Sequence, residues 1–361
     1  MRVLQGPVLS IGPEVERFEA ALAARSNRSF GVAVSSGTAA LHLIVRALGW
    51  PRDAEVITTP FSFVSSTNCL LYEGVRPVFV DIDAVTRCID PDRVERAITS
   101  RTVGIVSVDV FGVPADWERL EAIAVRHGLQ LLTDSCESIG AARITRNGRV
   151  VAGQSGVAGA FAFYPNKQMT TGEGGAVVTD DAALASLCRS MRNQGRDEGG
   201  GWLQHSRLGY NYRLSELSAA LGSSQLERLD SILTERADVA ARYAELLAPL
   251  APAILVPVAP PHTEVSWFVY VVQLSADFSQ EDRDAILAGL RACGIGCSNY
   301  FSPIHLQPYF VAQFGGKRGD FPVTEAVADR TIALPFFTGL DVDRQRVVVD
   351  ALARQLEARS R

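Results

Sequence analysis

A lysine next to a glycine-rich turn is the residue best suited to covalent chemistry in this chain of 361 residues. Lys167 follows the aromatic segment FAFYPN (161–166) and precedes the turn TTGEGG (170–175). A lone lysine after a strand is usually a solvated loop cation. Here aromatic residues, a proline and small residues surround it, which favours an amine held beside an apolar pocket, where it could act as a nucleophile.

Two further segments could bind the two ends of a charged ligand. The segment SSGTAA (35–40) joins a strand to a helix, so the backbone N–H groups near Gly37 and Thr38 would form an anion site. The segment LLTDSCE (131–137) ends an apolar strand with Asp134, at the strand end where open α/β sheets bind ligands. Taken alone, each segment would more simply be a helix N-cap.

Together the three segments predict a site for pyridoxal 5′-phosphate (PLP). This cofactor needs an anion cradle for its phosphate, a carboxylate beside its ring nitrogen and a lysine that forms an imine. The carboxylate keeps the pyridinium protonated, so that the ring can accept electrons from a carbanion. Phe61 or Phe63 in the segment TTPFSFVSSTN (58–68) could stack on the ring.

The elements that must position these residues alternate between helices and short apolar strands from about residue 13 to 195. This alternation predicts an α/β fold with a mostly parallel central sheet sandwiched by helices. The expected strands are Val32–Val34, Val56–Thr58, Pro77–Val80, Val103–Val108, Leu129–Thr133, Ala160–Phe163 and Ala176–Thr179.

The pattern changes after residue 210. Residues 213–250 are typical of long helices, and the proline-rich segment APAILVPVAPPH (251–262) breaks regular structure. A strand at 267–274, a helix at 280–292 and two closing helices are expected beyond it. We therefore predict a large cofactor domain over residues 1–245 and a smaller C-terminal α+β domain over residues 246–361.

Composition restricts the partners and the compartment. The net charge of −5, without a block of Lys or Arg, argues against nucleic acid or an anionic membrane as a partner. The six cysteines are scattered without a Cys-x-x-Cys pair, so no metal site is expected. The sequence has no signal-peptide pattern and no long apolar run, so we expect a cytoplasmic protein with reduced thiols.

Nine segments in order along the chain resemble the sugar aminotransferases of the DegT/DnrJ/EryC1/StrS family, which are fold-type I PLP enzymes. The nine segments are GPEVERFE, SSGTAALH, EVITTPFSFVSS, PVFVDID, TDSCESIGA, FAFYPNKQMTTGEGG, LGYNYRLSELSAALGSSQLERLD, SPIHLQPYF and FPVTEAVADRTIALPFF.

The resemblance assigns a role to each residue of the expected cofactor site. It implies that Lys167 binds the cofactor covalently and later moves a proton between the substrate carbon and the cofactor. It also implies that Asp134 pairs with the pyridine nitrogen and that Phe63 stacks on the ring. Gly37 and Thr38 would hold the phosphate.

The resemblance also implies a second subunit, and this chain departs from the family pattern at two positions. Asn211 matches a residue that reaches the phosphate from the neighbouring subunit, which implies a homodimer with shared active sites; a turn Asn before a helix is the alternative. Glu137 stands where the family often has Gln or His near the phenolic oxygen of the cofactor. Ala162 replaces a Ser that touches the phosphate, a loss of roughly 1–2 kcal/mol unless Ser36 or water compensates.

Three further residues could contact the substrate by the same resemblance. His305 and Tyr309 lie in the segment SPIHLQPYF (302–310), and Arg213 could bind a sugar pyrophosphate. The alternative for each is structural: a hydrogen-bonded histidine or tyrosine in a loop, and an arginine that braces its own segment.

The resemblance implies an aminotransferase that passes an amino group from an amino acid, most simply L-glutamate, to a keto sugar nucleotide. Lysine at position 167 favours transfer over deoxygenation, because related sugar dehydratases carry His there. The TTGEGG segment favours amination at C4 of a 4-keto-6-deoxyhexose. Two alternatives remain at this point: an aminocyclitol (keto-inositol) aminotransferase and a non-catalytic PLP-binding regulatory protein.

Overall fold

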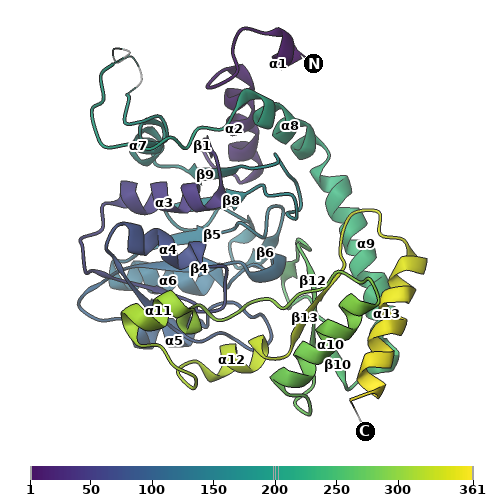
Figure 1. Cartoon of the computed structure of the whole chain (residues 1–361). Helices are drawn as coiled ribbons and strands as arrows, with labels where there is room; N and C mark the ends of the chain where they lie inside the picture. Colours follow the sequence, from purple (N-terminus) through teal and green to yellow (C-terminus); the bar gives the residue numbers. More distant parts are fainter. Residues whose placement is uncertain (1, 198, 200, 202, 360–361) are drawn as a thin grey trace.

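A seven-stranded sheet forms the centre of the molecule in the computed structural model, which describes residues 2–197, 199, 201 and 203–359 (Figure 1). The strands lie in the order β1-β9-β8-β5-β4-β2-β3. Their bounds in that order are Phe30–Val34, Gly175–Thr179, Ala158–Ala162, Gln130–Asp134, Thr102–Val108, Glu55–Thr58 and Arg76–Phe79. Strand β9 alone is antiparallel to its neighbours β1 and β8. The expected mostly parallel sheet is therefore confirmed, with one reversed strand.

Helices cover both faces of this sheet because its strands alternate two apolar sets of side chains. Val32 and Val34 of β1 pack into one core cluster with α3 (Gly37–Leu48), α4 (Ser65–Tyr72) and α7 (Ala182–Arg192). Ala33 between them faces the opposite cluster, which holds buried side chains of the other covering helices. These helices are α2 (Pro13–Arg25), α5 (Pro91–Ala97), α6 (Trp117–His127) and α8 (Glu216–Glu227); the short α1 spans Arg2–Gln5.

A second sheet with its own core lies toward the C-terminus, at the lower right of Figure 1. It has the order β10-β12-β13, from Ile254–Leu255, Tyr270–Leu274 and Thr331–Leu334, and packs with α10 (Gln280–Ala292) and α13 (Val342–Glu357). Helix α9 (Leu229–Leu247) contributes Val239 and Tyr243 to the same core. The core thus takes in side chains on both sides of residue 245, and the division at 245/246 stays a prediction.

Two helices near the C-terminus pack on the large sheet instead of on this smaller one. In α12 (Pro322–Ala328), the N–H groups of Val323 and Thr324 donate to the Asp81 carboxylate, at 2.9 and 2.8 Å. Asp81 follows β3, so this contact ties α12 to the edge of the large sheet. In α11 (Pro308–Phe314), the Phe310 ring lies 4.9 Å from that of Phe79.

A third, small sheet is absent from the sequence prediction. It joins β6 (Ala142–Thr145) and β7 (Gly148–Val151) to β11 (Thr263–Glu264), which is far away in the sequence. Three short 3-10 helices complete the structure: η1 (Val110–Gly112), η2 (Ala248–Leu250) and η3 (Ile304–Leu306). None of the helices in the described part of the chain has the length and hydropathy needed to cross a membrane.

Candidate active site

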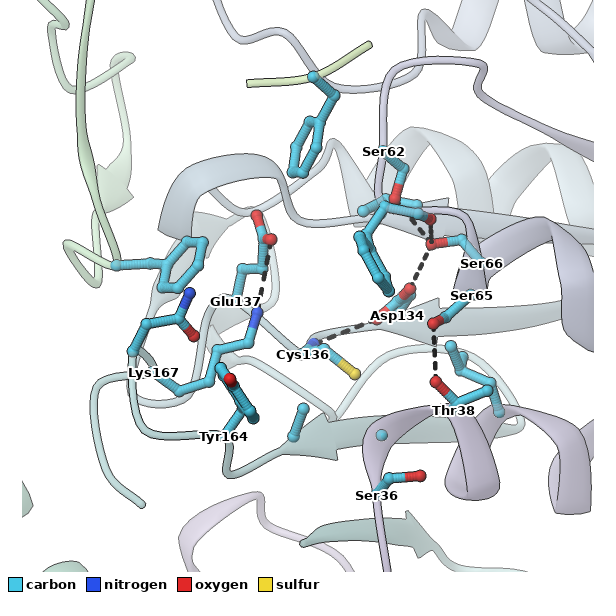
Figure 2. A pocket seen from close by; sticks show the side chains of 18 of the residues that line it. Ser36, Thr38, Ser62, Ser65, Ser66, Asp134, Cys136, Glu137, Tyr164 and Lys167 are labelled. Carbon is cyan, nitrogen blue, oxygen red and sulfur yellow. Dashed lines mark hydrogen bonds and ion pairs between the residues drawn. The ribbon is translucent and has the colours of Figure 1, made fainter. Parts of the chain in front are cut away.

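A cavity of about 480 Å³ opens where β5 and β8 reach their carboxyl ends, next to the start of α3 (Figure 2). In a parallel sheet this edge gathers the loops that follow the strands, which is why segments far apart in the sequence meet there. The cavity is lined by six of the predicted site residues: Gly37, Thr38, Phe63, Asp134, Glu137 and Lys167.

The start of α3 forms one wall of the cavity. Ser36 caps the helix, its Oγ accepting from the Ala39 N–H at 3.1 Å. The N–H groups of Gly37 and Thr38 belong to the first turn, where helix geometry provides no intrahelical acceptor. A Cβ on Gly37 would lie 2.6 Å from the Cβ of Ala162, so only glycine lets the helix start so close to β8. This wall can bind an anion.

Asp134 lines the cavity, and both of its carboxylate oxygens accept hydrogen bonds. Ser66 Oγ donates to its Oδ2 at 2.6 Å and the Cys136 N–H donates to its Oδ1 at 3.2 Å. Ser66 in turn is hydrogen-bonded to Ser62, with 2.7 Å between the two Oγ atoms. Asp134 is buried, and these donors hold its carboxylate in one orientation without supplying a cation.

Lys167 and Glu137 point toward each other across the cavity (Figure 2). Lys167 Nζ lies 3.5 Å from Glu137 Oε1 and 4.1 Å from the centroid of the Phe268 ring. The other carboxylate oxygen, Oε2, accepts from the Phe111 N–H at 3.0 Å. Burial raises the pKa of Glu137 above its ordinary value, although the Lys167 amine acts in the opposite direction.

An exposed aromatic ring lines the same cavity. Phe63 has 62% of its surface exposed, whereas Phe61, two residues earlier, is fully buried. Phe301 and Tyr300 close the cavity from the C-terminal part of the chain. An exposed phenyl face beside a carboxylate and an amine suits a flat aromatic ligand.

Four predicted residues do not line this cavity. Arg213 Nη1 donates to Asn193 Oδ1 at 3.1 Å, and Tyr309 OH donates to Asn68 Oδ1 at 2.8 Å. His305 is only 1% exposed and its Nε2 lies 3.0 Å from Glu325 Oε1, the kind of contact that the structural alternative expects. A substrate contact of His305 stays a prediction.

The fourth residue, Asn211, is exposed on the segment that runs beside the start of α3. The carbonyl of the next residue, Tyr212, accepts from the Ser35 N–H at 2.9 Å. In a single chain, the residue after Asn211 is therefore hydrogen-bonded to the segment that leads into α3, but Asn211 itself does not line the cavity.

Several lining residues were missed by the sequence prediction. Ser65 Oγ lies 2.7 Å from Thr38 Oγ1, and Ser66 orients Asp134 as described above. The cluster of serines in the segment TTPFSFVSSTN could have indicated that Ser65 and Ser66 contribute to the site. Phe268, Tyr300 and Phe301 left no signal, because only the folded chain brings them to residues more than a hundred positions earlier.

The residues present fit PLP. The N–H groups of Gly37 and Thr38 at the start of α3 match a phosphate, the oriented and buried Asp134 matches a protonated ring nitrogen, and the exposed ring of Phe63 matches the cofactor ring. Lys167 is the amine within the same cavity that can attach to the cofactor aldehyde.

Comparison with known proteins gives the same picture along nearly the whole chain. The model of the DegT/DnrJ/EryC1/StrS aminotransferase family matches residues 1–353. The spore coat polysaccharide biosynthesis protein SpsC of Bacillus subtilis (strain 168) is 35% identical over 359 residues, covering 97% of this chain and 91% of the relative. A pleiotropic regulatory protein of Geobacillus stearothermophilus is 36% identical over 359 residues, covering 98% and 93%. Among solved structures, DesV of S. venezuelae superposes with a TM-score of 0.89 at 35% identity, covering 99% of this chain and 92% of that one.

Proposed function

Because this chain belongs to the DegT/DnrJ/EryC1/StrS family of PLP-dependent aminotransferases, we propose that it transfers an amino group from L-glutamate to a keto sugar nucleotide. The preferred acceptor would be a 4-keto-6-deoxyhexose. The observation that carries this proposal is the common cavity of Lys167, Asp134 and the first turn of α3.

Each residue of the cavity would have a separate role in amino transfer. Bound PLP supplies an electron-accepting ring that stabilises negative charge on the carbon losing or gaining the amino group. The Asp134 carboxylate would hold the proton on the ring nitrogen, and Ser66 keeps that carboxylate aimed. The α3 N-terminus would bind the phosphate, and Phe63 would cover one ring face.

Lys167 and Glu137 would control the transfer of the proton to and from the reacting carbon. The Lys167 amine can take the proton from one carbon and return it to another, as a general base and then a general acid. Glu137, 3.5 Å from Nζ, can hold the protonated amine in place between these steps. Burial also raises the pKa of Glu137, which makes its carboxyl better able to exchange a proton with the Lys167 amine than an exposed glutamate would be.

The sugar preference rests on the TTGEGG segment. Glu173 of this segment lines the cavity and is exposed, and its carboxylate has no hydrogen bond within the described part of the chain. A free carboxylate at the mouth of the cavity can accept from sugar hydroxyl groups. This supports a polyhydroxylated acceptor and leaves the nucleotide unspecified.

A homodimer with shared sites belongs to the same proposal. Asn211 is exposed in the single chain, on a segment hydrogen-bonded to the strand end that leads into α3. An exposed amide next to one anion site can reach the corresponding site of a second copy across a two-fold axis.

The test is a panel assay with purified PLP-loaded enzyme, L-glutamate and a series of acceptors. We expect amino product, detected by mass spectrometry, from a 4-keto-6-deoxyhexose nucleotide and none when glutamate is omitted. Product only from a keto-inositol would establish the aminocyclitol alternative instead. No product from any acceptor, together with stable PLP binding, would favour a regulatory protein.

A further inference from the structure

Arg87 is a buried cation without a carboxylate partner in the described part of the chain. Arg87 is only 9% exposed. Within the described residues its side chain makes one hydrogen bond, in which Nη1 donates to the Val271 carbonyl at 3.2 Å. The guanidinium carbon lies 5.7 Å from the centroid of the Phe111 ring. Burial alone lowers the pKa of Arg87, to about 10. An unpaired buried charge is unfavourable, so an anionic partner would be strongly favoured here.

Other buried arginines of this chain are satisfied by their own surroundings. Arg192 pairs with the Glu19 carboxylate and also donates to the Ala33 carbonyl. Arg283 pairs with Asp284 and donates to the Ala328 carbonyl.

Arg236 lacks a carboxylate as well, but it donates to three carbonyls. Arg87, with one carbonyl, keeps the Nε and Nη2 donors free of hydrogen bonds within the described residues. Arg87 also lines a cavity.

This cavity has a volume of about 140 Å³ and shares no lining residue with the Lys167 cavity. Arg87 is the charged residue of its lining, and the deeper walls are apolar, from Phe111, Trp267 and Val269. The Phe111 ring stacks on the Phe301 ring, with 5.4 Å between their centroids. Phe301 lines the Lys167 cavity and Phe111 lines this one, so the stacked pair of rings lies between the two cavities.

The entrance of the cavity is also apolar. Val85, Leu255 and Val258 line it and are 64%, 48% and 59% exposed. Exposed apolar side chains around a pocket usually mark a binding site. One cation at the end of a small apolar pocket specifies a ligand with an anionic end and an apolar body.

We propose that this cavity binds a small monocarboxylate with an apolar body, whose carboxylate pairs with the Arg87 guanidinium. The planar guanidinium presents parallel N–H donors that match a carboxylate. The limited volume favours a short branched acid over a sugar or a nucleotide. The cavity shares no lining residue with the Lys167 cavity, so the proposed ligand would not occupy the amino-transfer site.

Calorimetric titration of the PLP-loaded enzyme with sodium isobutyrate tests the proposal, with the ionic strength held constant by sodium chloride. Isobutyramide, which has the same shape without the charge, serves as the ligand control. We expect isobutyrate to bind and isobutyramide not to bind. The visible absorbance of bound PLP is followed in parallel and should not change, because the two cavities are separate.

Variants separate Arg87 from general charge effects. Arg87→Met should weaken isobutyrate binding roughly tenfold or more, since a charge-assisted pair is lost. Arg96→Met removes an exposed arginine on α5 and should leave binding unchanged. Ligand-free Arg87→Met should melt no lower than the wild type, because it removes an unpaired buried charge.

Three results would overturn the proposal. The first is equal heat from isobutyrate and isobutyramide, and the second is wild-type binding by Arg87→Met. The third is a ligand-free Arg87→Met that melts well below the wild type, since Arg87 would then be a structural residue whose proper partner is the Val271 carbonyl.

Discussion

At the scale of single residues, the site holds two acidic groups with different partners. Asp134 accepts from neutral donors, a serine hydroxyl and a backbone N–H, whereas Glu137 faces the Lys167 amine. Asp134 is therefore short of a cation that a protonated ring nitrogen would supply, and Glu137 already has one. This difference supports the assignment of Asp134 to the ring and of Glu137 to the lysine.

Replacing Asp134 with Asn tests this assignment. The amide cannot stabilise a protonated ring nitrogen, so we expect kcat to fall by about 10²-fold or more. Steady-state kinetics with glutamate measure the effect. Ser66→Ala is the matched control: it removes only the 2.6 Å hydrogen bond that aims Asp134 and should cost much less. Near-normal kcat in Asp134→Asn would mean that another acid serves the ring.

Replacing Ala162 with Ser tests the phosphate wall. Ser36 Oγ already accepts from the Ala39 N–H, so its hydroxyl hydrogen is the donor that it can still offer to a phosphate. A serine at position 162, at the end of β8, would add a second hydroxyl donor. We expect the Kd for PLP to fall by roughly fivefold or more, measured by equilibrium dialysis of the apoenzyme. An unchanged or weaker affinity would show that Ser36 or water already fills this position, or that the close contact with Gly37 excludes the larger side chain.

The residues closest to strand ends could be predicted from the sequence. Asp134 ends β5, Lys167 follows β8 and Gly37 begins α3, and each carries a local pattern of an apolar strand followed by small or polar residues. His305 had an equally suggestive setting in SPIHLQPYF, yet its imidazole is buried against Glu325. The pattern around a histidine does not show which way its ring turns.

At the scale of elements, Asp109 connects three parts of the site scaffold. It follows β4, and its Oδ1 accepts from the N–H of Ala115 and the Nε1–H of Trp117, both at 2.9 Å. Its Oδ2 accepts from Ser135 at 2.7 Å and Ser138 at 2.8 Å. Since those serines flank Glu137, Asp109 positions the loop after β5.

Asp109 should also make stability depend on pH. Burial raises the pKa of Asp109 from its ordinary 3.8 to about 6 in the folded protein. Between these values the folded state holds a proton that the unfolded chain has lost, so this contribution to stability falls as the pH rises through about 6. In Asp109→Asn, we expect a flatter dependence of Tm on pH between about 4 and 6. Thermal melts of apoenzyme measure it, with Asp116→Asn, at the half-buried N-cap of α6, as control. Parallel curves for wild type and Asp109→Asn would contradict the expectation.

The strands of the large sheet could be predicted because they are continuous apolar runs, buried on both faces. Their order within the sheet was not predicted. The small sheet of β6, β7 and β11 could not be predicted, because its strands are short and partly exposed, and because β11 pairs with β6 across more than a hundred residues. The long helical segment divides at Arg228 into α8 and α9, and no glycine or proline marks that break.

At the scale of the whole molecule, the net charge of −5 says little about the ligand. The anion sites discussed above are local: a helix start in one cavity and a single guanidinium in another. Tyr300 and Phe301, from the C-terminal part, complete the wall of a cavity built on the large sheet, so both parts of the chain line the same cavity.

Shared sites in a homodimer can be tested with a heterodimer of Lys167→Ala and Asn211→Ala chains that carry different tags. If Asn211 serves the partner's site, one of the two sites contains both intact residues. We then expect about half of wild-type activity from the purified heterodimer, and far less from either parent. A heterodimer no more active than the Asn211→Ala parent would place Asn211 outside the partner's site.

The most direct test of amino transfer at Lys167 omits the sugar altogether. PLP-loaded enzyme is mixed with excess L-glutamate, and 2-oxoglutarate is measured against the number of subunits, for the wild type and for Lys167→Ala reconstituted with PLP. We expect about one equivalent of 2-oxoglutarate per subunit from the wild type, and a rate lower by about 10³-fold or more in the variant. No 2-oxoglutarate from the wild type, or an equal rate in the variant, would contradict amino transfer from glutamate by this lysine.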